Sequence, residues 1–365
     1  MVNQVIQYIM VFFMALGVID RAFLNNKLGF GEPFEEGINA MGPLAMAMVG
    51  MMCFAPVLGN ILTPIMTPLF NLINADPAML AGSILALDMG GYPLAAAMTS
   101  DPDIVALSGI ILGSMLGATV IFAIPVSLGI IPEKDRDYLA QGIMMGLISV
   151  PFGCVVSAML ANIPLSKTLI NLLPIILFSA VLVFGLLKAQ KITMKIFNVF
   201  AKVITAILTV TFGLAIFQEL TGVILVQGMD PIGPQLEIVG YIAITLAGAY
   251  PFVSFLTKRL SKLLSKAGGV LGISDVSMGG LIAVLANSIP MYNMVKDMDP
   301  KGKVMSIAFS VPAATVFGDH LAYVSTNDPS LVMPVIVGKL FAGFVAIGIV
   351  LLFTKSKSYE IKSEI

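Results

Sequence analysis

The chain contains nine apolar runs, and each is long enough to cross a lipid bilayer as a helix. A spanning helix takes about 20 predominantly apolar residues. The runs are Val2–Ile19, Ile38–Leu58, Ile104–Ile131, Tyr138–Ala161, Thr168–Leu187, Ile196–Val226, Leu236–Leu256, Val304–Ser325 and Leu331–Phe353. Helices satisfy their own backbone groups in lipid. The sequence therefore predicts an all-α, polytopic membrane protein with the lipid bilayer as its surroundings.

The composition agrees with this class and argues against several others. Of the 365 residues, 58% are hydrophobic and 11% are charged, whereas about 25% of an average soluble domain is charged. The net charge of −1 gives no basic surface for nucleic acid. A single histidine and two cysteines in apolar runs predict reduced thiols and no metal site or cofactor.

Two further apolar stretches, Met79–Met98 and Val270–Pro290, are interrupted in the middle. Both contain Asp, Gly and Pro residues where a regular spanning helix would continue. Such interruptions are typical of broken helices or re-entrant hairpins. We therefore expect about nine spans plus two interrupted segments, or up to eleven crossings if these segments also traverse the bilayer.

The charges of the connections predict which side each one faces. Cytoplasmic loops of membrane proteins carry an excess of Lys and Arg. Four connections contain neither, and we place them outside: Asn71–Pro77, Asp101–Asp103, Gln227–Gln235 and Thr326–Ser330. With this assignment the N-terminus is outside, the C-terminus is cytoplasmic, and the two interrupted segments enter from opposite faces.

Entry from opposite faces indicates an inverted-topology repeat. With an offset of 198 residues, Gly50 maps onto Gly248 and Gly82 onto Gly280. Residues 1–167 would form the first repeat, with four spans and the hairpin 79–98. Residues 168–198 would be a linker span and a cytoplasmic loop, and 199–365 the second repeat with the hairpin 270–290. A single linker span inverts the second repeat.

Ionisable residues inside apolar segments are candidates for function because they are costly in lipid. Asp88 and Asp275 lie in the two interrupted segments beside Gly pairs, where an unwound backbone and a carboxylate would suit a cation. The alternative for each is that it only caps a half-helix.

Asp319 and His320 are adjacent in the run Val304–Ser325. The structural alternative is that Asp319 pairs with Lys339 of the next run, and a titrating His320 could also relay protons. Tyr92 and Tyr323 could offer aromatic faces to an ammonium group, and Asn287 could bind a hydroxyl. The predicted substrate-binding residues, with no catalytic residue and no metal ligand among them, are Asp88, Tyr92, Asp275, Asn287, Asp319, His320 and Tyr323.

Three stretches carry a family resemblance: Leu87–Ala95, Ser277–Met291 and Val316–Leu321. Through them, and over essentially its full length, the chain resembles the EutH membrane proteins of bacterial ethanolamine utilisation. The resemblance implies a permease of the bacterial cytoplasmic (inner) membrane with ethanolamine as its partner, a transporter and not an enzyme. The sequence leaves open whether the protein forms a homo-oligomer.

Ethanolamine is mostly protonated near neutral pH, and such a cation crosses hydrocarbon poorly. We therefore expect an alternating-access carrier of ethanolaminium. The alternative is a Na⁺- or H⁺-coupled transporter of another small polar or cationic solute. An intramembrane enzyme lacks support, because neither a GxSxG nor an HExxH motif is present.

Overall fold

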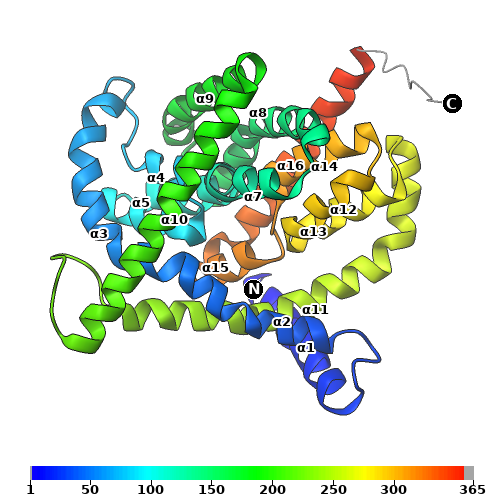
Figure 1. Cartoon of the computed structure of the whole chain (residues 1–365), viewed down its shortest axis with the longest axis horizontal. Helices are drawn as coiled ribbons and strands as arrows, with labels where there is room; N and C mark the ends of the chain where they lie inside the picture. Colours follow the sequence, from blue (N-terminus) through cyan, green and yellow to red (C-terminus); the bar gives the residue numbers. More distant parts are fainter. Residues whose placement is uncertain (1, 357–365) are drawn as a thin grey trace.

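The structure, a computed structural model, is helical throughout the part of the chain that it describes (Figure 1). It describes the backbone of residues 2–356, and the side chains of these residues except 2–4, 6, 257, 260–267 and 354–356. Within that part no strand occurs, which agrees with the predicted all-α class.

The helices follow one another with short connections. The first half contains α1 (Val2–Phe23), α2 (Gly31–Asn39), α3 (Met41–Asn71), α4 (Met79–Ile84), α5 (Tyr92–Met98), α6 (Pro102–Ile104), α7 (Ile124–Ile130), α8 (Arg136–Leu160) and α9 (Leu165–Lys188). The second contains α10 (Gln190–Thr221), α11 (Ile232–Leu271), α12 (Asp275–Ala286), α13 (Ser288–Met294), α14 (Pro300–Ala313), α15 (Asp319–Asn327) and α16 (Val332–Ser356). Wide π-helical turns form η1 (Leu87–Gly91), η2 (Val105–Gly117) and η3 (Thr119–Ala123), and 3₁₀ turns form η4 (Glu133–Asp135), η5 (Val295–Asp297) and η6 (Pro329–Leu331).

Seven helical segments among the described residues are long and apolar enough to cross a membrane. They are Gly31–Asn71, Pro102–Ile130, Glu133–Leu160, Leu165–Lys188, Gln190–Thr221, Ile232–Leu256 and Pro329–Phe353. Each contains most or all of one of the nine predicted spans. The predicted span Val2–Ile19 lies within α1, a helix of 22 residues.

The prediction of one continuous span over Val304–Ser325 is wrong, because the helix is broken there. α14 ends at Ala313, and α15 begins at Asp319. The backbone N–H groups of Thr315 and Phe317 instead donate to the carbonyl oxygens of Val284 and Leu285 near the end of α12. These bonds to another helix replace the intrahelical bonds that the break removes, so the backbone remains satisfied.

Both interrupted segments contain a break between short helices, but in the second the break lies at Asn287, and the predicted interruption around Asp275 and Gly279–Gly280 is regular helix in α12. In the first, α4 and α5 are separated by Leu85, Ala86 and the turn η1. In the second, the extended residue Asn287, with φ of −154° and ψ of 133°, separates α12 from α13. Non-helical backbone at these points is surrounded by protein, since Leu85, Ala86 and Ser288 are all buried.

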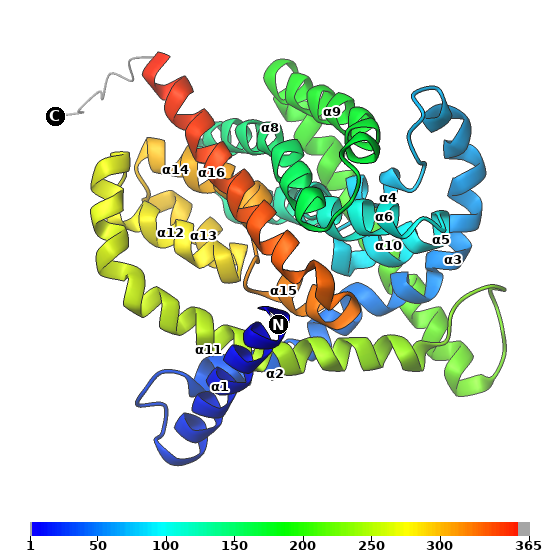
Figure 2. The ribbon, with the colours of Figure 1, turned by 180° about the vertical axis from the view of Figure 1, so that it is seen from behind.

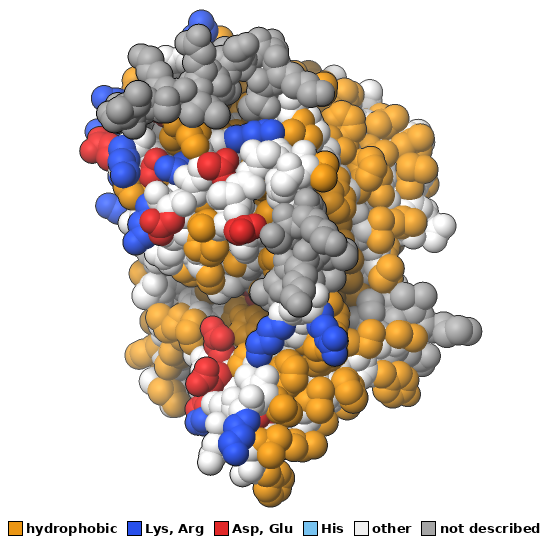
Figure 3. Space-filling view, turned by 90° about the vertical axis from the view of Figure 1, so that its right-hand side faces the viewer, with side chains coloured by type: hydrophobic (Ala, Val, Ile, Leu, Met, Phe, Trp, Pro, Cys, Tyr) orange, Lys and Arg blue, Asp and Glu red, His pale blue; other side chains and the backbone are white. Residues whose placement is uncertain are grey.

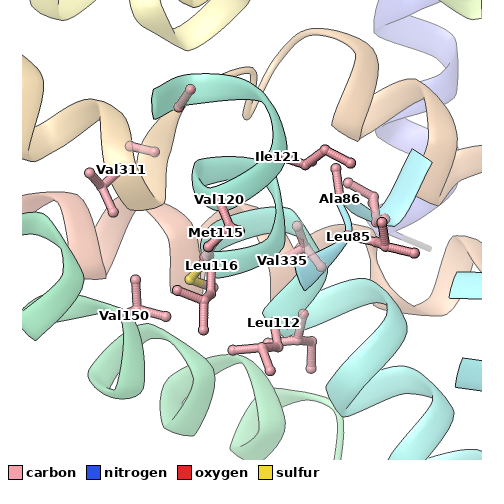
Figure 4. Packing of buried hydrophobic residues seen from close by; sticks show 14 of the residues in the cluster. Leu85, Ala86, Leu112, Met115, Leu116, Val120, Ile121, Val150, Val311 and Val335 are labelled. Atoms are coloured by element: carbon pink, nitrogen blue, oxygen red, sulfur yellow. The ribbon is translucent and has the colours of Figure 1, made fainter. Parts of the chain in front are cut away.

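The core lies where these broken segments meet longer helices. α16 packs along α8 and α14 (Figure 2). Figure 4 shows Leu85 and Ala86 of the first break near side chains of η2, such as Leu112 and Met115, with Val150 of α8, Val311 of α14 and Val335 of α16 around them. Packing in the core therefore fixes the position of the first helix break.

The connections separate toward two opposite ends of the molecule. At left in Figure 1 lie the α3–α4 and α10–α11 connections, which contain no Lys or Arg, and at right lie the α1–α2 connection and the C-terminal end of α11. Figure 3 views this right-hand end, where Lys and Arg side chains gather on one part of the face and hydrophobic side chains cover another. Two of the four connections without Lys or Arg thus lie at one end of the fold.

Candidate functional site

The first interrupted segment carries Asp88 into the interior. The backbone is extended at Leu85 and Ala86 before it enters η1. Gly90 has a φ of 100°, which residues with a Cβ rarely adopt, and an added Cβ would collide with Met51. The resulting turn leaves Asp88 only 7% exposed. Its carboxylate therefore lies within protein and away from bulk water.

The break between α14 and α15 supplies Asp319 and His320. Asp319 is the first residue of α15, and its Oδ1 accepts a hydrogen bond of 2.9 Å from the backbone N–H of His320. A carboxylate is stabilised at a helix N-terminus because the unpaired N–H groups there carry partial positive charge. The break thus provides a favourable place for the half-buried carboxylate of Asp319.

Asp88, Asp319 and His320 converge on one point. His320 Nε2 lies 4.0 Å from Asp88 Oδ1, and one side-chain oxygen or nitrogen of each residue lies within 4.8 Å of the others. In a regular helix two adjacent residues point about 100° apart. Asp319 and His320 are the first two residues of α15, yet a side-chain oxygen or nitrogen of each still lies within 4.8 Å of an Asp88 carboxylate oxygen.

Lys339 of α16 completes this cluster from the other side. Its Nζ lies 3.0 Å from His320 Nδ1 and donates to the backbone carbonyl oxygen of Ser114 in η2. The side chain is fully buried. If the ammonium donates to Nδ1, the neutral imidazole carries its proton on Nε2, which faces Asp88.

The structural alternative, a direct Asp319–Lys339 ion pair, does not describe this contact. Among the described residues, no ion pair within 4.0 Å joins these two side chains, and Lys339 reaches the cluster through the imidazole. In the sequence, Lys339 stands out because it is the single Lys of the apolar run Leu331–Phe353. Ser114 had no such signal, because it contributes a backbone carbonyl oxygen.

Two tyrosines from the elements that carry the cluster line a pocket. The rings of Tyr92 and Tyr323 meet edge to face, with centroids 6.2 Å apart and an interplanar angle of 80°. Both residues line a cavity of about 410 Å³, whose polar lining also includes Asn60, Asp230, Gln235 and Asn327. Asp230 belongs to the α10–α11 connection, so the pocket lies toward the end of the molecule that is poor in Lys and Arg.

Asp275 and Asn287 are placed differently from the other predicted site residues. Asp275 is exposed at the start of α12, and a 12-residue helix is about 18 Å long, which separates it from the break at the far end. Asn287 lies at that break, where its Oδ1 accepts the backbone N–H of Ile289 at 2.9 Å. The structure thus gives Asn287 a capping contact and does not bring Asp275 into the cluster.

Two ion-pair groups tie the ends of the bundle. Lys167 Nζ lies 2.9 Å from Asp101 and 2.7 Å from Asp103, and its hydrogen bond holds the pKa of the Asp101 carboxyl below the usual range. In a separate pair Lys303 Nζ lies 2.6 Å from Asp135, with both side chains at least 90% buried. These pairs connect α9 to the start of α6 and α14 to η4.

Comparison with known proteins gives a consistent family assignment. The sequence model of the family described as "Ethanolamine utilisation protein, EutH" matches residues 2–353. The "Probable ethanolamine permease EutH" of Listeria monocytogenes is 45% identical, with 95% of this chain and 93% of the relative covered. The "Probable ethanolamine permease EutH" of Escherichia coli is 38% identical over 100% of this chain and 98% of its own.

A third relative, the "Uncharacterized protein YxeR" of Bacillus subtilis, is 39% identical over 94% of this chain and 93% of its own length. No solved structure matches the chain at a significant level. The match of the family model over nearly all residues, together with relatives of this identity and coverage, shows that the chain belongs to the EutH family of ethanolamine utilisation proteins.

Proposed function

We propose that this protein is a carrier that takes up ethanolamine, as protonated ethanolaminium, across the bacterial cytoplasmic membrane by alternating access. Two kinds of observation support the proposal. Relatives that cover almost the whole chain are named as ethanolamine permeases, which are transporters and not enzymes. The observation that carries it is the cluster of buried Asp88 and His320 with half-buried Asp319 at two helix breaks. We assign the ammonium group of the substrate to this cluster, with Asp88 as its main partner.

The charges of the cluster suit a monovalent cation. With Asp88 and Asp319 ionised, Lys339 protonated and His320 neutral, the formal sum is −2 + 1 = −1. A single positive charge on the ligand would neutralise it. Buried charges are stable only when paired and hydrogen-bonded, so ethanolaminium would be bound more favourably here than a neutral amine.

The aromatic rings beside the cluster add a second attraction. A cation near a tyrosine face is stabilised by the ring quadrupole, by about 0.5–2 kcal/mol. Tyr92 and Tyr323 line the 410 Å³ pocket, and Tyr323 lies one helical turn after Asp319 in α15. We propose that ethanolaminium passes along this aromatic wall between the pocket and the carboxylates.

The alternating movement would follow from an inverted repeat, and close helix contacts support that arrangement. A Cβ at Gly50 would meet the backbone of Leu208 in α10, and a Cβ at Gly248 would meet the backbone of Met10 in α1. The offset relates both members of these contacts, since 50 + 198 = 248 and 10 + 198 = 208. We therefore retain residues 1–167 and 199–365 as the two proposed repeats.

The hydroxyl of Ser108 donates to the carbonyl oxygen of Ala78, and that of Ser306 donates to the carbonyl oxygen of Ser277. Ser108 and Ser306 differ by the same offset, because 108 + 198 = 306. In carriers built from such repeats, one part rocks against the other around a site at broken helices. The acceptors Ala78 and Ser277 differ by 199 residues, one more than the offset, so the contacts of Gly50 and Gly248 are the matched set that favours this mechanism.

Uptake of labelled ethanolamine into proteoliposomes tests the proposal. At acidic pH the neutral amine is scarce, so passive leak is smallest. We expect saturable uptake by the natural protein, and its loss in Asp88→Asn, because the amide removes the charge that binds the ammonium. Asp297→Asn is the matched control, since Asp297 is exposed in η5.

The outcomes distinguish the alternatives. Uptake that Asp88→Asn leaves unchanged would contradict the assignment of the ammonium to Asp88. Absence of ethanolamine uptake by the natural protein would contradict the function itself and favour a coupled transporter of another small polar or cationic solute. Competition by such solutes, with and without Na⁺ or a pH gradient, would then identify the cargo and the coupling ion.

A further inference from the structure

The hydroxyl of Tyr323 is a buried polar group that the fold leaves without a partner. Tyr323 is 0% exposed, and its hydroxyl oxygen has no hydrogen-bond partner among the described residues. Buried hydroxyl groups are nearly always hydrogen-bonded, because an unpaired one loses its contact with water without replacement. An unpaired hydroxyl in a native interior therefore points to a missing partner.

The position of Tyr323 connects this hydroxyl with the cluster. Tyr323 follows Asp319 by four residues in α15, and residues four apart share one face of a helix. The side chain also lines the 410 Å³ pocket. Its ring packs edge to face against Tyr92, which lines the same pocket, so the side chain that carries the hydroxyl has a defined place.

We propose that Tyr323 recognises the hydroxyl group of the substrate by a direct hydrogen bond. This inference rests on the proposed function, and it concerns recognition of the substrate hydroxyl, which the carboxylates do not determine. Carboxylates alone would bind any small primary ammonium ion of similar size. The Tyr323 hydroxyl can both donate and accept, so it can pair with an alcohol, while an alkylamine would leave it unpaired. It would act as the residue that selects an amino alcohol over an alkylamine.

Competition against labelled ethanolamine uptake tests this selection. Unlabelled ethanolamine and ethylamine, which lacks the hydroxyl, are compared as inhibitors of the natural protein and of Tyr323→Phe. The selectivity is the ratio of their half-inhibitory concentrations. We expect the natural protein to prefer ethanolamine, and Tyr323→Phe to reduce that selectivity about tenfold, mainly by weakening ethanolamine, as loss of one buried hydrogen bond predicts.

Tyr241→Phe is the matched control, because Tyr241 is 54% exposed on α11 and lies outside the pocket lining. This variant should keep the natural selectivity. Inhibition of Tyr323→Phe by ethylamine shows in the same assay that the variant is folded and retains its ammonium site. If Tyr323→Phe fails to fold, ethylamine and 2-methoxyethylamine, whose ether oxygen accepts but cannot donate, still show whether the natural protein recognises the substrate hydroxyl, and inhibition by ethylamine equal to that by ethanolamine overturns the inference.

Several results would overturn the inference. One is an unchanged selectivity in Tyr323→Phe, and another is a natural protein that binds ethylamine as tightly as ethanolamine. If the natural protein transports ethanolamine and Asp88→Asn abolishes uptake while Tyr323→Phe keeps full selectivity, only the assignment of the hydroxyl fails. If the natural protein does not bind ethanolamine at all, the proposed function and this inference both fail.

Discussion

Lys339 is a fully buried cation whose contacts join three parts of the chain. Its Nζ contacts the His320 imidazole and the Ser114 carbonyl oxygen, and the imidazole in turn faces Asp88. At the scale of single residues, the charge of the cluster therefore depends on one side chain of α16. Removing one member of a buried charged group is strongly destabilising, because the remaining charges lose their compensation.

We expect Lys339→Met to lower the stability of the protein by about 3–5 kcal/mol and to abolish ethanolamine uptake. Methionine has a similar length but neither charge nor donors, so the Ser114 carbonyl oxygen and His320 lose a partner. Thermal unfolding in detergent measures the effect, with Lys188→Met as the control because Lys188 is exposed at the end of α9. Equal unfolding temperatures for the two variants would contradict this role.

The helical elements place the polar groups through their ends. Asp88 lies in the turn between α4 and α5, and Asp319 is the first residue of α15. A regular spanning helix offers no free backbone groups to a buried carboxylate, whereas a helix start offers unpaired N–H groups. Broken helices are therefore the elements that can stabilise a polar site in the interior of the protein.

The start of α6 gives a prediction for the pH dependence of stability. Asp101 caps this helix by accepting the Asp103 backbone N–H at 3.0 Å, and it also pairs with Lys167. Asp101→Asn keeps a side-chain oxygen for the cap and removes the ion pair. Because both charged groups are about one-third exposed, we expect a loss of about 0.2–1 kcal/mol at pH 7.

The sign of this pH effect follows from the lowered pKa of Asp101. The ionised carboxylate is favoured in the folded state, so its contribution is complete above the ordinary pKa of about 3.9 and is lost as the pH falls through the lowered value. Unfolding midpoints at pH 7, 5 and 2 measure the difference between Asp101→Asn and the natural protein. A difference that stays constant down to pH 2 would contradict the ion-pair explanation.

At the scale of the whole molecule, the two ends of the fold should face opposite sides of the membrane. Cysteines introduced at Asn71 and at Val270, both exposed, report on the connections before the two interrupted segments. We expect a membrane-impermeant thiol reagent to label Asn71→Cys from outside and Val270→Cys only from the cytoplasmic side. Both native cysteines are buried, which keeps the background labelling low.

Lys134→Cys serves as the positive control for the cytoplasmic side, because Lys134 is exposed in the turn η4 and belongs to a connection with Lys and Arg that we place in the cytoplasm. Labelling of Asn71→Cys and Val270→Cys from the same side would exclude the opposite insertion of the two interrupted segments. The proposed inverted repeat would then lose its topological basis, whatever the close contacts of Gly50 and Gly248 indicate.

Much of the architecture can be predicted from the sequence because it depends on local properties. The length and polarity of an apolar run decide whether it suits lipid, and the Gly-rich interruption near Asp88 marks where regular helix ends. The same local criteria identify Asp88, Asp319 and His320 as candidates, since each is an ionisable residue in an apolar segment. Membership of the EutH family likewise follows from the sequence alone.

Only the tertiary structure decides how these local features meet. The break between α14 and α15 depends on hydrogen bonds from Thr315 and Phe317 to α12, and no periodicity within residues 304–325 encodes a partner on another helix. Local sequence likewise does not encode that Lys339 contacts His320 and not Asp319. It also does not encode that Asp275 lies exposed at the far end of α12. Hydropathy and helix breaks are properties of neighbouring residues, whereas a buried polar site is a property of distances between segments far apart in the chain.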